Sequence, residues 1–254
     1  MLLAIDIGNS HVVLGVFEGE RLAESWRVGT KASITADEYA MILKDLFGFA
    51  GLEFRRIDGI IISSVVPPLL PTMTEVSKKY FSIEPMIVTN ELKTGITLRY
   101  DNPREIGADR IVNAAAAYRI YGGPLIIIDF GTATTFCAVT KNGEYLGGAI
   151  VPGVKISAEA LYQRAAKLPR VELVRPERVI GRDTVSAMQA GIVFGYAALV
   201  DGLVARMKQE LSPDAQVVAT GGLAGLVAAE AKSINEVRPE LTLEGLRLLF
   251  EINR

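Results

Sequence analysis

The sequence predicts an α/β protein built from two related domains. One pattern occurs twice, about half a chain apart: an apolar run, an aspartate, one apolar residue, a glycine and a small polar residue occupy residues 3–10 and 126–133. A β-rich run and two polar turns follow each copy, so each half is predicted to open with strand, turn, strand, turn, strand. Helical and strand patterns then alternate, as in α/β domains. Repeats this long and this few exclude a solenoid.

The first half continues with helices and strands in turn. Thr35 and Glu38 form a capping box, which predicts a helix over residues 35–49. Residues 57–65 are apolar enough for a strand buried on both faces, and two prolines end it. The remaining elements expected here are a helix over residues 69–81, a short strand over 86–89, a loop or hairpin over 92–102 that carries Tyr100, and a helix over 105–121.

The second half is predicted to contain helices over residues 154–168 and 184–211, a strand over 216–220 followed by a glycine turn and a short helix, and a last helix over 242–253 that Thr242 caps. A break rich in glycine and proline at residues 121–124 marks the expected domain junction. The predicted domains are therefore residues 1–121 and 122–241, and the terminal helix 242–254 is expected to pack back on the first.

Composition excludes several function classes. Lysine and arginine number 27 and aspartate and glutamate 29, a net charge of −2, which argues against nucleic-acid binding. Cys137 is the only cysteine and His11 the only histidine, so an intrachain disulfide and a multi-histidine zinc site are excluded. Asp6 interrupts the first apolar run, unlike a signal peptide, and residues 192–205 contain Asp201 and are too short to span a bilayer. We expect a soluble, cytoplasmic protein.

The two Asp–Gly turns carry the groups that bind a polyphosphate. Gly8 and Gly131 let the backbone approach an anion, and side-chain donors accompany them: Asn9, Ser10, Thr132, Thr134 and Thr135. Asp6 and Asp129 would repel phosphate unless a cation lay between, so they are candidate ligands of Mg²⁺ or a monovalent cation. The alternative is that both turns use Asp and Gly only for hairpin geometry.

Two further pieces extend this site. Gly221 and Gly222 follow a strand and open a helix, which allows adenosine to lie against the main chain. Asp109 and Arg110 are adjacent at a predicted helix start, where Asp109 could deprotonate a hydroxyl and Arg110 could bind a carboxylate in a bidentate fork. The alternative for this pair is an exposed surface ion pair, although adjacent helical residues do not face each other.

At these residues the chain resembles the superfamily of acetate and sugar kinases, Hsp70 and actin, and more narrowly the type III pantothenate kinases. The motifs that carry the resemblance are residues 6–10, 107–110, 129–132, Gly153, residues 181–184 and residues 219–223. Ser10 departs from the commoner threonine but keeps the hydroxyl. The resemblance implies two ribonuclease H-like domains of the actin-like ATPase fold with a cleft between them.

The resemblance also implies an activity: ATP-dependent phosphorylation of pantothenate to 4'-phosphopantothenate, the first step of coenzyme A biosynthesis. It implies Mg²⁺, a monovalent cation (K⁺ or NH₄⁺) and a homodimer. Asp129 would bind the monovalent cation and Asp6 would bind Mg²⁺, directly or through water. The implied ATP-binding residues are Asp6, Ile7, Gly8, Asn9, Ser10, His11, Val12, Val13, Thr132, Gly221 and Gly222.

For pantothenate, the resemblance implies contacts from Tyr100, Gly107, Ala108, Asp109, Arg110 and Thr184, with Asp109 as proton acceptor. Thr184 is also expected to be a helix N-cap, whose helix terminus attracts an anion. Two other functions stay open on the sequence alone. One is a nucleotide-binding regulatory protein of the accessory-factor type, and the other is a kinase for another small hydroxyl acceptor such as a sugar.

Overall fold

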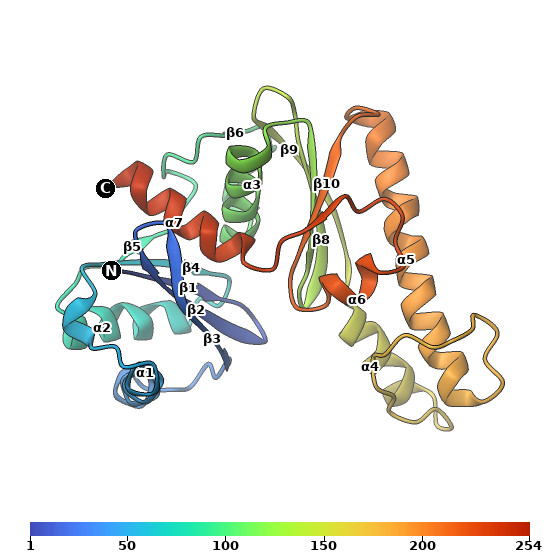
Figure 1. Ribbon diagram of the computed structural model, residues 1–254, viewed down its shortest axis with the longest axis horizontal. Helices are drawn as coiled ribbons and strands as arrows, with labels where there is room; N and C mark the ends of the chain where they lie inside the picture. The colour runs from blue at the N-terminus through green and yellow to red at the C-terminus, as the bar shows by residue number, and fades with distance from the viewer. The chain divides into compact units, whose positions relative to one another are not determined.

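The structure is a computed structural model that describes residues 1–254 (Figure 1). The chain divides into two compact units, and each is made of separate stretches of sequence. Unit 1 contains residues Met1–Gly95, Asn102–Ala116 and Leu241–Arg254, and unit 2 contains Ile96–Asp101 and Ala117–Glu240. Helix α3 (Ala108–Tyr121) therefore begins in unit 1 and ends in unit 2.

Unit 1 is a five-stranded mixed sheet in the order β3-β2-β1-β4-β5. Its strands are β1 (Leu2–Ile7), β2 (His11–Glu18), β3 (Arg21–Gly29), β4 (Gly59–Ser64) and β5 (Met86–Ile87). The first three strands form an antiparallel meander, and β4 and β5 add to it in parallel. The apolar runs of β1 and β4 at the centre are buried because helices cover both faces of the sheet.

Helices α1 (Ala36–Phe49) and α2 (Leu69–Phe81) cover one face of this sheet and α7 (Leu241–Asn253) covers the other (Figure 1). The main core of unit 1 lies under α1 and α2, where Leu3, Ile5 and Ile62 are buried. The predicted capping box starts α1: the Glu38 N–H donates to the Thr35 hydroxyl at 3.3 Å, and the Glu38 carboxylate accepts from the Thr35 N–H at 2.9 Å. This prediction is confirmed.

Unit 2 is a six-stranded sheet in the order β11-β10-β7-β8-β9-β6. Its elements are β6 (Thr97–Leu98), β7 (Leu125–Phe130), β8 (Ala133–Val139), β9 (Glu144–Pro152), α4 (Val154–Arg164), α5 (Thr184–Glu210), β10 (Gln216–Thr220), α6 (Ala224–Ala228) and β11 (Glu236–Val237). Side chains of α4, α5 and α6 pack against one sheet face to form its core. The meander β7-β8-β9 repeats β1-β2-β3, so the predicted α/β fold with two related halves is confirmed.

Several predicted boundaries differ from the structure. The last helix begins at Leu241, so Thr242 lies inside it and does not cap it; its hydroxyl donates to the Asn113 Oδ1 at 2.8 Å instead. The segment that carries Tyr100 forms no hairpin, because β6 pairs in parallel with β9. Helix α4 ends at Arg164, short of the predicted residue 168.

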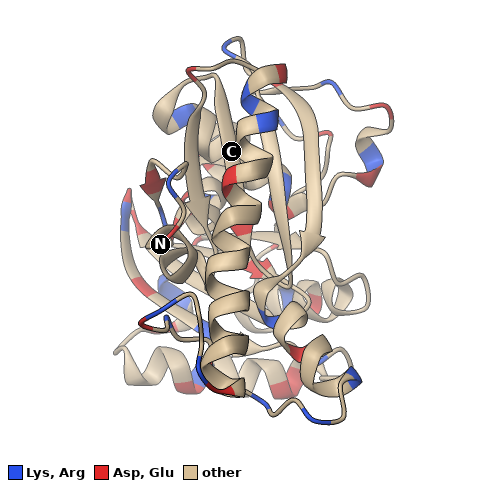
Figure 2. Cartoon of the chain, turned by 90° about the vertical axis from the view of Figure 1, so that its right-hand side faces the viewer, with Lys and Arg blue, Asp and Glu red and all other residues tan.

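Helix α5 has 27 residues and so extends beyond the apolar stretch 192–205, which alone is too short to span a bilayer. By length and composition alone the whole helix could cross a membrane. That test is weak evidence, because the core helices of soluble proteins pass it too, and 44% of the apolar window is buried. Figure 2 shows that the outward side of α5 carries no charged residue along most of its length.

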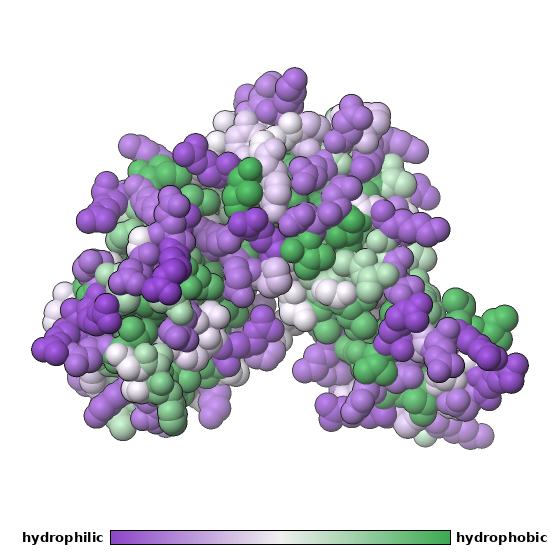
Figure 3. Space-filling model, viewed as in Figure 1, coloured by the Kyte–Doolittle hydropathy of each residue, from purple (hydrophilic) through white to green (hydrophobic).

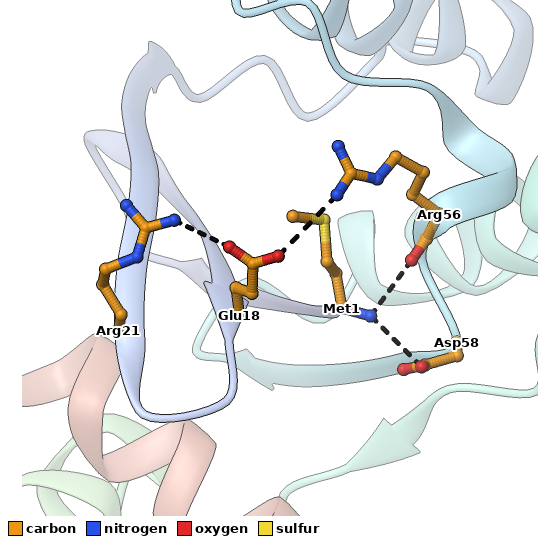
Figure 4. A network of polar contacts seen from close by, with 5 residues as sticks. All are labelled: Met1, Glu18, Arg21, Arg56 and Asp58. Carbon is orange, nitrogen blue, oxygen red and sulfur yellow. Dashed lines mark hydrogen bonds and ion pairs between the residues drawn. The ribbon is translucent and has the colours of Figure 1, made fainter.

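A surface network fixes the start of β1 (Figure 4). The Met1 ammonium pairs with the Asp58 carboxylate at 3.1 Å and donates to the Arg56 carbonyl at 3.0 Å. Glu18 joins the same group by pairing with Arg21 at 2.7 Å and with Arg56 at 3.7 Å. These contacts are largely exposed, and such pairs contribute about 0–1 kcal/mol each.

Candidate functional site

The first Asp–Gly turn, residues 8–10, connects β1 and β2 and is closed by main-chain hydrogen bonds. The Gly8 N–H donates to the His11 carbonyl at 2.9 Å. Thr30, directly after β3, makes two hydrogen bonds to this turn. Its hydroxyl donates to the Gly8 carbonyl at 2.6 Å, and its N–H donates to the Ser10 carbonyl at 3.1 Å. Sequence reasoning missed Thr30, although the pairing of β2 with β3 brings it here. Asn9 and Ser10 remain exposed.

Side chains around this turn point to opposite faces of the sheet. Ile7 and Val12 are fully buried in the core under α1 and α2, so only their main chain is available to a ligand. Asp6 is partly exposed and, by the strand register, shares a face with Ser63 of β4 and Val13 of β2. Alternation along the strand therefore separates the polar Asp6 from its apolar neighbours.

The start of α3 brings Asp109 and Arg110 into the interior of unit 1. Arg110 is 7% exposed and Asp109 is largely buried, so the alternative of an exposed surface ion pair is wrong. The Asp109 Oδ1 accepts from the Arg110 N–H at 2.8 Å. Burial raises the pKa of the Asp109 carboxyl, while the Arg110 N–H and the guanidinium charge oppose that shift. A Cβ at Gly107 would lie 2.4 Å from Asp109 Oδ1, so any side chain there would require this carboxylate to move.

The second Asp–Gly turn, residues 131–132, connects β7 and β8. The Gly131 N–H donates to the Ala133 carbonyl at 3.1 Å, and the Gly153 N–H donates to the Thr132 carbonyl at 3.1 Å. Thr132, the residue expected to contact phosphate, is exposed. Thr134 is fully buried and bonded to Tyr196 at 2.7 Å, so its expected role as a phosphate donor is wrong.

Oxygen donors gather around Asp129 at the end of β7. The register places Thr220 of β10 and Thr135 of β8 beside it on the same face of the sheet. Gly221 lies so close that a Cβ there would be 2.5 Å from Asp129 Oδ1. Carboxylate, hydroxyl and carbonyl oxygens are the ligands that hard cations take. The structure contains no cluster of three or more His, Cys, Asp or Glu residues, which fits a cation that draws further ligands from phosphate and water.

Tyr100 and Thr184 both belong to unit 2. The Tyr100 ring lies against Gly147 of β9, and its centre is 6.3 Å from the ring centre of Tyr145. Thr184 is the exposed first residue of α5, but the N-cap is Asp183, whose carboxylate accepts from the Ser186 N–H at 2.9 Å. The prediction that Thr184 caps the helix is therefore wrong by one residue.

The predicted site residues are thus divided between the units. Within unit 1 the structure groups the first turn with its flanking strands, and separately groups Gly107, Asp109 and Arg110 at the start of α3. Within unit 2 it brings Asp129 together with Gly221. Each unit therefore contributes both an acidic residue at a strand end and a tight glycine turn.

Two comparisons with known sequences point to one family. The sequence profile described as type III pantothenate kinase matches residues 2–206. A type III pantothenate kinase from Geobacillus sp. (strain WCH70) is 54% identical over 253 residues, which cover 100% of this chain and 98% of the relative.

Solved structures of lower identity share the fold. A protein from Campylobacter jejuni assigned to the Baf family of transcriptional activators is 18% identical, with a TM-score of 0.62 over 98% of this chain and 97% of that one. An inorganic polyphosphate/ATP-glucomannokinase from Arthrobacter sp. strain KM is 14% identical, with a TM-score of 0.52 over 99% and 97% of the two chains. At these identities the likeness concerns architecture alone.

Proposed function

The chain belongs to the type III pantothenate kinase family, and we propose that Asp109, Asp129 and the two Asp–Gly turns carry out its phosphoryl transfer. Family membership makes the protein a kinase that phosphorylates pantothenate in coenzyme A biosynthesis. The observation that carries our assignment of residues is the repeated Asp–Gly turn, with an exposed polar residue in each copy. A turn needed only for hairpin geometry would not require an aspartate at the same strand position twice.

We propose that Asp109 is the general base. Its carboxylate would accept the proton of the primary hydroxyl of pantothenate as that oxygen attacks the γ-phosphorus of ATP. Burial raises the pKa of Asp109, which makes its carboxylate a better proton acceptor, and the Arg110 N–H opposes that shift. Most of the rate acceleration would come from positioning and from stabilising charge.

The two turns would bind the phosphates of ATP. Exposed Asn9, Ser10 and Thr132 offer side-chain donors beside main-chain N–H groups. Gly221 and Gly222 would accommodate the adenosine. We propose that Asp6 holds Mg²⁺, directly or through water, and that Asp129 holds a monovalent cation, K⁺ or NH₄⁺. When bound, these cations offset the negative charge of the triphosphate.

Pantothenate is an anion with an amide and hydroxyl groups. We propose that the Arg110 guanidinium binds its carboxylate and that Tyr100 and Thr184 bind its polar groups, with Gly107 and Ala108 lining the same subsite. The close packing of Gly107 against the Asp109 carboxylate supports this, because it fixes the base relative to Arg110.

We also propose a cytoplasmic homodimer, assembled in part through α5. Small residues line the exposed side of this helix at helical spacing: Ala187, Gly191, Gly195, Ala198, Gly202 and Ala205. Their side permits close helix packing and carries no charge over most of its length (Figure 2). The connection between α4 and α5 adds apolar surface (Figure 3), with Val179 67% and Ile180 83% exposed. Light scattering should give twice the chain mass of 27.4 kDa, and Gly195→Arg should give the single-chain mass.

A coupled assay with purified protein, ATP, Mg²⁺, K⁺ and pantothenate tests the activity. ADP release that depends on pantothenate is expected, and sugars tested at the same ATP concentration should give none. Replacing K⁺ by Na⁺ should lower the rate, and Asp129→Asn should abolish that dependence. Nucleotide binding without ADP release, in folded protein with several cations tried, would support a regulatory protein of the same fold instead.

A further inference from the structure

One buried phenol joins three elements of unit 2. The phenol oxygen of Tyr196, on α5, lies 2.7 Å from the Thr134 hydroxyl of β8 and 2.7 Å from the Pro152 carbonyl at the end of β9. Tyr196 is 6% exposed and Thr134 is fully buried. The contacts are therefore screened from water and have a fixed geometry.

The protons in this group can be assigned by chemistry. A carbonyl oxygen only accepts, so Tyr196 must donate its single proton to Pro152, and the Thr134 hydroxyl must donate to the phenol oxygen. Burial raises the pKa of the Tyr196 phenol, so it keeps the proton that this arrangement needs. Every proton of the two hydroxyl groups is therefore used inside the protein.

The two oxygen partners of Tyr196 lie in β8 and β9, the two strands next to the second Asp–Gly turn on one side. Thr134 is in the strand that leaves the turn, and Pro152 directly precedes Gly153, whose N–H donates to the Thr132 carbonyl at 3.1 Å. The Pro152–Gly153 peptide group therefore accepts from Tyr196 through its carbonyl and donates to the turn through its N–H. Loss of the phenol would remove a hydrogen bond from each of these two strands where they support the turn.

We propose that Tyr196 is a positioning residue for ATP, which fixes the second Asp–Gly turn by bonding to Thr134 in the strand that leaves the turn and to the Pro152 carbonyl of the adjacent strand. The proposal rests on the proposed function of the turn as a phosphate-binding element. It differs from a purely structural role because it predicts a selective effect. ATP binding should weaken, whereas pantothenate binding should not, because none of the residues assigned to pantothenate belongs to the second turn; Thr184 shares α5 with Tyr196 but lies at the start of that helix.

The test is a set of matched variants assayed for both substrates. Thr134→Val removes one hydrogen bond of the group and should raise the KM for ATP by about fivefold. Tyr196→Phe removes both hydrogen bonds of the phenol and should raise the KM for ATP by about tenfold or more. The KM for pantothenate should stay within about twofold of wild type. Thr134→Ser keeps the hydroxyl and should behave as wild type. Tyr118→Phe removes a phenol that contacts only the Lys141 carbonyl, at 3.3 Å, and is the matched control.

Thr134→Val keeps the test decisive if Tyr196→Phe fails to fold, because it leaves the Tyr196–Pro152 bond in place. An unchanged KM for ATP in folded Thr134→Val or Tyr196→Phe would overturn the proposal, as would equal losses for both substrates. If wild type shows no pantothenate-dependent ADP release, the proposed function fails separately. Calorimetric titration with MgATP then tests the positioning role alone, and equal affinities of wild type and Tyr196→Phe would overturn it.

Discussion

Gly153 sits where any side chain would collide with the second Asp–Gly turn. A Cβ at this position would lie 2.2 Å from the Thr132 carbonyl oxygen and 2.6 Å from that of Gly131, whereas real Cβ atoms essentially never come closer than 3.0 Å. Both obstacles are backbone atoms, so Gly153→Ala must push the turn back by roughly 1 Å, a misplacement that can lower a rate about 100-fold. We expect kcat/KM for ATP to fall by about this factor.

The assay compares Gly153→Ala with Gly48→Ala at saturating pantothenate. Gly153 has a φ of −63°, which alanine adopts freely, so the effect comes from contact rather than backbone strain. Gly48 lies in α1 with no atom within 4 Å of the added Cβ, and alanine there should raise stability by up to about 1 kcal/mol without changing the rate. A Gly153→Ala variant with kcat/KM within twofold of wild type would refute the reasoning.

Three other changes test separate parts of the structure. Asp109→Asn should lower kcat by roughly 100- to 10,000-fold while MgATP still binds in calorimetry. Burial raises the folded-state pKa of this carboxyl above its unfolded value, so the ionised form destabilises the fold once the pH exceeds the folded-state pKa. The Asn variant should therefore melt no lower than wild type at pH 7. The wild-type rate should fall as the pH drops through the folded-state pKa of Asp109. Thr30→Val removes the hydroxyl that donates to Gly8 and should raise the KM for ATP about fivefold; an unchanged value would show that the first turn needs no outside support. Leu246→Ala, at a fully buried position of α7, should cost about 2–5 kcal/mol in urea unfolding, and a loss below about 1 kcal/mol would contradict the packing of α7 on the sheet of unit 1.

The repeated opening of each half was predictable because its signals are local. Polar turns and alternating apolar residues determine a strand meander within about 25 residues, and both meanders match the prediction closely. Alternation could also have corrected the expectation for Thr134, since it shares a strand face with buried Phe136. The alternation predicts a buried Thr134, whereas the number of hydroxyl residues alone suggests a phosphate contact.

Other features depend on contacts between distant segments and have no local signature. Tyr196 lies 62 positions from Thr134 and looks like one more aromatic residue in an apolar helix. The burial of Asp109 follows from how α3 packs, which its own sequence does not reveal. The start of α5 at Thr184 was predicted but its cap was misplaced by one residue, and α7 begins one residue before Thr242, because several hydroxyl and carboxylate residues there are equally plausible caps.

The distribution of unit 1 over three stretches of the chain has a consequence for synthesis on the ribosome. The first sheet is translated early, yet the helix that covers its second face, Leu241–Asn253, follows all of unit 2 in the chain. All of unit 2 therefore emerges before the sheet of unit 1 can be completed, which reverses the usual order in which domains mature during translation. Until α7 has emerged, the nascent chain exposes an apolar surface of this sheet, and truncation before Leu241 should yield a product that chaperones retain or proteases remove.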